Sequence, residues 1–239
     1  MDETAATFTP LLAATALFVA SHFLLSARSA RDALVRLLTE RGFLLAYSLL
    51  AGALFVWMNL AYARAPFEDL WGDPLWARWA AVALMPVATV FLVAGVTTAS
   101  PAAVGGDRLF AQRVREPVGI QKVTRHPVLW ALAIWAALHL AANGDLASAI
   151  FFGGLLALCL GGMAHIESRR RSQGGANWAP FAAQSSALPF AAVLAGRARV
   201  SLAEIGWSRI ATGLGLYLVF LFGHRVVIDV PILPGLAGG

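Results

Sequence analysis

The chain has 239 residues, of which 59% are hydrophobic and only 13% are charged, and its mean hydropathy is +0.71. A soluble protein of this length could not bury so much apolar surface, so the composition predicts a polytopic membrane protein and excludes an ordinary soluble domain. The single cysteine, Cys159, lies in an apolar run, which excludes a disulfide framework and a zinc site with Cys/His spacing.

The chain begins with MDETAATFTPLLAATALFVASHFLL, which lacks the basic n-region of a signal peptide. We therefore expect a retained first transmembrane helix. Further apolar stretches able to cross about 30 Å of hydrocarbon follow along the sequence, although the fourth is short for a span. The six expected spans lie near residues 8–27, 42–62, 76–99, 127–142, 147–166 and 207–223.

Two further segments are expected at the membrane surface. ARSARDALVRLLTER (27–41) sets leucines against arginines, which predicts a short amphipathic helix. The segment 176–196 is apolar but contains Pro180 and Pro189, which predicts an interfacial or re-entrant segment rather than a span. The expected fold is therefore an all-α, polytopic membrane helical bundle of about six transmembrane helices plus this segment, forming one domain over residues 1–239.

The basic residues are distributed unevenly along this topology. With the N-terminus outside, the outer side keeps only three of the 18 lysines and arginines, a positive-inside pattern that also places the C-terminus outside. The pattern accounts for the net charge of +5 and the pI of about 10.3. The expected partner of these charges is membrane lipid and not nucleic acid. The three outer basic residues are Arg64, Arg78 and Arg225.

Two histidines are expected inside spans, where an ionisable group is costly. His22 lies in the first span, and His139 lies one turn from the outer end of the fourth span, four residues before Asn143. Either each imidazole is neutral and hydrogen-bonded to a neighbouring helix, or histidines on different helices hold a haem between them, with Asn143 as a further cofactor contact. No CxxCH motif occurs, so such a haem is haem b, bound non-covalently.

The sequence TRHP (124–127) places Arg125 and His126 directly before a helix-starting proline. A cation, an imidazole and free backbone N–H groups at a helix N-terminus suit a carboxylate, a phosphate or a lipid headgroup. The alternative is ordinary positive-inside anchoring. His224, after the last span, is either solvated or caps an outer pocket, and Glu167 is expected to pair locally with the three arginines that follow it.

Several short motifs follow one another across nearly the whole chain: SH (21–22), RG with an aromatic-rich span (41–62), RAP (64–66), TRHP (124–127), WAxxHLxxNGD (135–145) and WxxF…LPFAAVLAGR (178–197). Their order resembles the NnrU family. The resemblance implies a protein of the bacterial inner (cytoplasmic) membrane, associated with denitrification and nitric-oxide metabolism. The family also includes 15-cis-zeta-carotene isomerase, which resembles a membrane cis-trans isomerase dependent on haem b.

Carried over from the isomerase branch, the haem iron ligands fall on His22 and His139. The position that holds a reactive thiolate in that branch is Ala136, so this chain departs from the pattern there. The spans assigned above place the two histidines at heights that differ by about 15 Å, whereas two axial nitrogens on one iron are about 4 Å apart. His126 and His224 are therefore alternative ligands, His126 with His22 at the inner side and His224 with His139 at the outer side.

The RHP motif is also similar to the cofactor-side motif of isoprenylcysteine and phospholipid methyltransferases, which implies S-adenosylmethionine. In those enzymes a tyrosine and a glycine typically follow RHP and a paired-glutamate element lies downstream. Here Leu129-Trp130-Ala131 follows, and Glu167 stands alone in place of the pair, so the match is partial. Three functions remain open. They are a haem b-dependent isomerase of an apolar, conjugated substrate such as a carotenoid, a non-catalytic accessory protein for a nitric oxide reductase, and an S-adenosylmethionine-dependent membrane methyltransferase.

Overall fold

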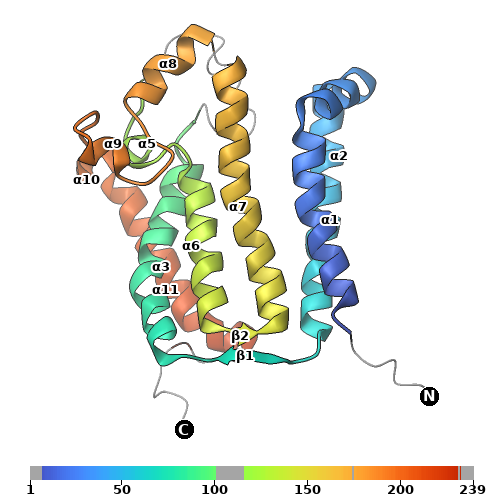
Figure 1. The fold of residues 1–239 in the computed structure, drawn as a ribbon. Helices are drawn as coiled ribbons and strands as arrows, with labels where there is room; N and C mark the ends of the chain where they lie inside the picture. The colour runs from blue at the N-terminus through green and yellow to red at the C-terminus, as the bar shows by residue number, and fades with distance from the viewer. Residues whose placement is uncertain (1–6, 101–115, 174, 231, 233–239) are drawn as a thin grey trace. The chain divides into compact units, whose positions relative to one another are not determined.

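A computed structural model describes residues 7–100, 116–173, 175–230 and 232. The described chain is almost entirely helical, with one two-stranded ribbon, which confirms the all-α membrane fold class (Figure 1). The elements are α1 Thr9–Ser26, α2 Arg28–Arg64, β1 Asp69–Gly72, α3 Leu75–Val96, α5 Ile120–Val123, α6 Pro127–Ala142, β2 Gly144–Asp145, α7 Leu146–Gln173, α8 Gly175–Ala183, α9 Ala191–Leu194, α10 Leu202–Ile205 and α11 Trp207–Ile228.

Among the described residues, five helices are long and apolar enough to cross a membrane: α1, α2, α3, α7 and α11. The fourth expected span is α6, which is apolar but has only 16 residues, as its short apolar stretch predicted. Only 11% of the most apolar window of α2 and 6% of that of α11 is buried within the protein. Such exposed apolar helices need a hydrocarbon environment, because in water their surfaces would aggregate.

The chain divides into two compact units. Unit 1 comprises residues 1–74 and 139–158, and unit 2 comprises residues 75–138 and 159–239. Helices α6 and α7 contribute residues to both units. The positive-inside orientation stays a prediction, and three of the arginines that support it (Arg108, Arg113 and Arg115) lie outside the described residues.

In unit 1, α1 packs antiparallel against α2, with Phe18 beside Phe55. The predicted surface helix and second span form a single element interrupted at Thr39, whose φ of 65° and ψ of 166° are not helical. Arg31 reaches across this break, pairs with Glu40 at 2.5 Å and lies over the ring of Phe43 at 5.6 Å. The amphipathic segment is therefore helical, as predicted, and is fixed to the start of the span.

Small residues set the close contacts of unit 1. A Cβ added at Gly144 would lie 2.1 Å from the carbonyl oxygen of Gly72, so only glycine lets β2 pair with β1 here. On α7, a Cβ at Gly154 would lie 2.2 Å from Cγ2 of Thr15, which shows how closely α1 packs against α7. Gly153, the preceding residue, has open space around the same position.

In unit 2, α3 packs against α11 through Gly213, whose added Cβ would lie 2.7 Å from the Cα of Val90. The Tyr217 hydroxyl donates to the carbonyl oxygen of Val82 at 3.0 Å and ties the same two helices. Between α7 and α11, the described residues form no helix long enough to be a candidate span: α8 contains Pro180, and Phe190 adopts a left-handed φ of 62° before α9. A small core joins α3, α5, α6 and α10, formed by Phe91, Ala94, Ile120, Val123, Ala131 and Ile205.

Candidate functional site

The TRHP motif is held by the backbone of the segment between α8 and α9. The Arg125 N–H donates to the carbonyl oxygen of Ser186 at 2.8 Å, and the Phe190 N–H donates to that of Val123 at 2.8 Å. The Thr124 hydroxyl donates to the carbonyl oxygen of Ala187 at 2.8 Å. Pro127 has no N–H to offer the carbonyl oxygen of Val123, so the polar groups of residues 123–125 that the helices leave unpaired find these partners instead. These hydrogen bonds fix the TRHP motif and the irregular segment 184–190 to each other.

Arg125 is the centre of a buried charge cluster. Its Nε and Nη2 atoms donate to the two carboxylate oxygens of Glu167, each at 2.8 Å, in the bidentate geometry that guanidinium favours. Nη1 donates to the carbonyl oxygen of Ser185 at 3.0 Å, and the guanidinium lies 5.5 Å from the ring centroid of Trp178. The side chains of Arg125 and Glu167 are only 8% and 9% exposed, so solvent screens this pair very little.

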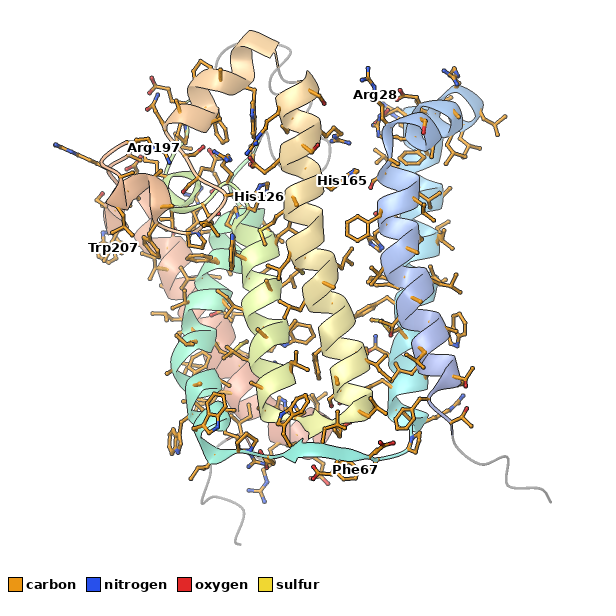
Figure 2. The ribbon with its side chains drawn as sticks, viewed as in Figure 1. Arg28, Phe67, His126, His165, Arg197 and Trp207 are labelled. Carbon is orange, nitrogen blue, oxygen red and sulfur yellow. The ribbon has the colours of Figure 1, made fainter. Side chains whose placement is uncertain are left out.

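His126 belongs to the same cluster, at the start of α6 and beside α7 (Figure 2). Its Nε2 lies 2.9 Å from Oε1 of Glu167, and its side chain is 1% exposed. A carboxylate paired with arginine only accepts hydrogen bonds, so Nε2 carries the proton and donates it to this bond. In neutral His126 the other nitrogen, Nδ1, is then a bare acceptor. Glu167 thus orients an imidazole whose free lone pair could accept a proton.

The partners of Glu167 differ from the expected ones. The sequence favoured a local ion pair with the arginines that follow it, whereas the structure pairs it with Arg125 and His126, which precede it by 42 and 41 residues. The charge that the motif offers to an incoming anion already faces a carboxylate of the same chain. A haem propionate or other anion bound there would have to displace Glu167.

His22 lies in unit 1 with its imidazole fixed by its own helix. Nδ1 lies 2.6 Å from the carbonyl oxygen of Phe18, so Nδ1 carries the proton and donates it. The ring packs on Phe18 at 4.5 Å and on Tyr47 at 5.5 Å between centroids. Within the described part of the chain no residue hydrogen-bonds to Nε2. A protonated Nδ1 bound to a backbone carbonyl, with Nε2 left bare, is the arrangement common to metal-ligating histidines.

His139 also lies in unit 1, but at another level of the helices. Its ring packs on Phe152 at 5.1 Å, and Phe152 packs on Tyr62 at 6.0 Å, whereas His22 packs on Tyr47. Tyr47 and Tyr62 are 15 residues apart on α2 (62 − 47), which is about 22 Å along a helix. The structure therefore does not bring His22 and His139 together, in agreement with the height difference expected from the sequence.

The remaining candidates have other partners. Asn143 donates from Nδ2 to the carbonyl oxygen of His139 at 2.7 Å, so it caps the end of α6. His224, in unit 2, has Nδ1 3.0 Å from the carbonyl oxygen of Val230 and is partly exposed. His126 uses its Nε2 for Glu167. Over the described ranges, no group of three or more His, Cys, Asp and Glu side chains suits a metal ion.

A second polar chain, at the other end of α7, was not anticipated. Asp145 accepts the Ser148 N–H at 2.9 Å and the Ser148 hydroxyl at 2.6 Å, and Tyr62 lies 2.8 Å from the same hydroxyl oxygen. Since Ser148 donates to the carboxylate, the Tyr62 hydroxyl donates to Ser148. An Asp three residues before a Ser at a helix start is a signal for the cap alone. The Tyr62 partner, 86 residues earlier, leaves no such signal.

Comparison with known protein families identifies one family that matches this chain. A family model described as NnrU protein matches residues 10–232, which is nearly the whole chain. The chain belongs to the NnrU family. The NnrU match covers His22, TRHP, His139 and Glu167, and it confirms the resemblance expected from the motif order. No curated protein and no solved structure gives a significant match.

Proposed function

We propose that this NnrU-family membrane protein binds haem b and that His22 would hold its iron. The observation that supports the proposal is the orientation of His22: Nδ1 donates to the Phe18 carbonyl oxygen, and Nε2 is left bare in a half-buried aromatic setting. Neutral imidazole held in this tautomer is a suitable iron ligand, and aromatic rings such as those of Phe18 and Tyr47 would pack against an apolar macrocycle.

The residues fit a haem held by His22 alone better than one held by His22 together with His139. His139 lies about 22 Å from the level of His22, measured along α2, and His126 already bonds Glu167. We therefore propose that His22, without His139, would hold the haem. When bound, the haem would supply an electrophilic iron for cis-trans isomerisation of a conjugated, lipid-like substrate such as a carotenoid, without net redox change.

Absorption spectroscopy tests the haem proposal. The protein is produced with haem supplied and purified as wild type, His22→Ala, His139→Ala and His224→Ala, with helicity checked by circular dichroism. We expect a Soret band that disappears in His22→Ala and persists in the other two variants. The proposal is wrong if the wild type has no Soret band, or if His139→Ala removes the band while His22→Ala leaves it unchanged.

Two cellular readouts separate the isomerase from an accessory role with a nitric oxide reductase. If the protein is an isomerase, deleting its gene causes a cis-carotenoid or similar polyene to accumulate, and the purified holoprotein converts that compound, as followed by chromatography. If it serves a nitric oxide reductase, the deletion strain accumulates nitric oxide and its polyenes are unchanged. Conversion by the His22→Ala protein at the wild-type rate would exclude the haem as the catalyst.

The second candidate is an S-adenosylmethionine-dependent methyltransferase at the TRHP end of α6. The observation that favours it is that Arg125 and His126, which resemble the cofactor-side motif of membrane methyltransferases, both bond Glu167, the residue that stands in place of that motif's paired glutamates. Titration calorimetry of the purified protein with S-adenosylmethionine tests this candidate. Binding heat that Glu167→Gln abolishes would support it, and no detectable heat in the wild type would remove it.

A further inference from the structure

The segment 188–207 has an exposed apolar surface although it lies outside every candidate span except for its last residue. Its large exposed side chains stand at α9, at α10, in the connecting loops and at the first residue of α11. Their exposed fractions are 62% for Leu188, 47% for Phe190, 85% for Leu194, 57% for Leu202 and 63% for Trp207. We call these five residues the apolar cap. In water such a surface would cost free energy in proportion to its area.

The apolar cap is one side of a firmly held segment. Its other side is buried in unit 2 through Ala192, Ala198 and Ile205, which are at most 9% exposed. Backbone N–H groups of Arg197 and Ala198 both donate to the carbonyl oxygen of Ala192 and close a tight loop after α9. The segment is therefore amphipathic by its tertiary fold, with small residues inward and large apolar residues outward, although α9 and α10 have only four residues each.

The charge around the apolar cap is positive. The stretch 188–207 contains a single acidic residue, Glu204, which pairs with Lys122 at 2.5 Å. Arg197 and Arg199 are exposed, and Arg197 also donates to the carbonyl oxygen of Ala183 at 2.6 Å. In the part of the chain that the structure describes, neither arginine forms an ion pair, so both present uncompensated charge beside the apolar side chains.

The apolar cap lies against the end of a membrane-spanning helix. Figure 1 shows α9 and α10 beside the end of α11 at which that helix begins, and α10 contacts α11. Figure 2 shows Arg197 and Trp207 on the same side of unit 2. Trp207 is the first residue of α11, and tryptophan at the end of a span is typical of the headgroup layer. Lipid around a membrane-spanning α11 would therefore be continuous with the surface of the apolar cap.

We propose that the apolar cap is inserted into the interfacial layer of the membrane and, with Arg199 and Arg197, binds phospholipids that have anionic headgroups. The apolar side chains replace contact with water by contact with acyl chains, and the guanidinium groups reach the headgroup phosphates. The partner is a lipid rather than another protein, because the surface continues from a span and carries the positive charge that an anionic leaflet attracts. The proposal is independent of haem binding.

Spin-label accessibility in lipid nanodiscs tests the depth of the apolar cap. In a Cys159→Ala background, single cysteines replace Leu194 and Leu202, with Leu218 in the middle of α11 as the lipid reference and Ser172 at the end of α7 as the aqueous reference. We expect labels at Leu194 and Leu202 to collide with oxygen more than with a water-soluble nickel chelate, as at Leu218. Preference for the nickel chelate, as at Ser172, or protection from both reagents by a covering protein, would overturn the proposal.

Lipid selectivity tests the role of the charge. Arg199→Gln is compared with Arg225→Gln, which removes the same charge from an exposed position at the opposite end of α11. Binding of phosphatidylglycerol over phosphatidylcholine is measured by native mass spectrometry of protein released from mixed nanodiscs. Arg199→Gln should weaken phosphatidylglycerol binding about fivefold, the effect expected for one basic residue near an anionic surface. An equal loss in both variants, or no loss in Arg199→Gln, would show that the cap does not select anionic headgroups.

Discussion

His22 in unit 1 and His126 in unit 2 are both histidines at membrane helices, but their surroundings differ in kind. His22 bonds a backbone carbonyl of its own helix and is otherwise surrounded by aromatic rings. His126 bonds Glu167 from another helix, and Glu167 is shared with Arg125. The arrangement at His22 leaves one ring nitrogen free for a ligand and forms no hydrogen bond to another helix of the described chain. The arrangement at His126 joins the start of α6 to α7 through charged groups, so removing one of these groups should cost stability.

The same contrast extends to the rest of each unit. Unit 1 is held by close contacts of small residues and by single hydrogen bonds, such as Gly154 against Thr15 and Tyr62 with Ser148. Unit 2 is held at its TRHP end by a buried network of ionic and backbone bonds. A hydrogen-bonded network is costly to break in an apolar setting, whereas small-residue contacts respond to volume. The two kinds of packing therefore predict different sensitivities to substitution.

The largest effect is expected when Glu167 is removed. Glu167→Ala leaves Arg125 buried without its carboxylate, and breaking a buried pair from one side costs about 3–5 kcal/mol. Glu204→Ala is the matched control. It removes a carboxylate whose side chain is 32% exposed and which pairs with Lys122. An ion pair in contact with solvent contributes about 0–1 kcal/mol. Unfolding of the purified protein in detergent measures both. Equal losses of stability would show that the buried cluster does not hold unit 2 together.

A smaller effect is expected from the paired glycines of α7, which test the small-residue packing of unit 1. Gly154→Ala pushes a methyl group into Thr15 and should cost about 1–3 kcal/mol of stability, the range for overpacking. Gly153→Ala has open space and should be neutral or stabilising by up to about 1 kcal/mol. The same unfolding measurement checks the pair, and indistinguishable variants would contradict the close approach of α1 to α7.

The smallest loss of stability is expected when the pH is lowered, through the partly exposed pair of Lys122 and Glu204 in unit 2. Partial burial raises the pKa of Glu204, but hydrogen bonds from Lys122, Gly119 and Ser201 outweigh it and hold that pKa below its ordinary value of 4.5. When the pKa of a carboxyl group is lower in the folded than in the unfolded protein, its ionised form stabilises the fold at pH values above the unfolded-state pKa. This contribution is lost as the pH falls through the folded-state pKa. The loss should amount to about 0.2–1 kcal/mol.

Comparison with Glu204→Gln isolates this contribution. The variant has no carboxylate to protonate, so its stability should fall less than that of the wild type between about pH 6 and about pH 3. Stability is measured by unfolding in the same detergent at both pH values. Identical pH profiles would mean that the pair with Lys122 contributes nothing measurable.

The sequence predicted what depends on apolar length and on helix-breaking residues. Five expected spans are helices, the fourth is as short as its apolar stretch, and the prolines of 176–196 prevent a span there. The level difference between His22 and His139 also followed from helical rise. A boundary between the surface helix and the second span was expected at residues 41–42, and the structure has it at Thr39. The positive φ of Thr39 was not predicted, because a threonine in that conformation has no sequence signature.

Long-range partners were the other part that the sequence did not predict. TRHP was identified as a site, but the nearest arginines to Glu167 in sequence were favoured as its partners. The actual partner, Arg125, lies in the link between α5 and α6, and nothing local distinguishes a carboxylate that pairs with its neighbours from one that pairs 42 residues away. The segment 176–196 was likewise expected to be interrupted by its prolines, without any indication that TRHP bonds the backbone of residues 186–190.

The separation of Arg125 from Glu167 also has a consequence for synthesis. Arg125 leaves the ribosome 42 residues before its carboxylate partner and about 60 residues before Ser185. At about 5–20 residues per second, the arginine waits about 2–8 s for Glu167 alone. During that interval the start of α6 carries an unneutralised charge, so it has to remain in contact with water or lipid headgroups. Final seating of α6 therefore follows the insertion of α7, which makes α6 a late step in the assembly of unit 2.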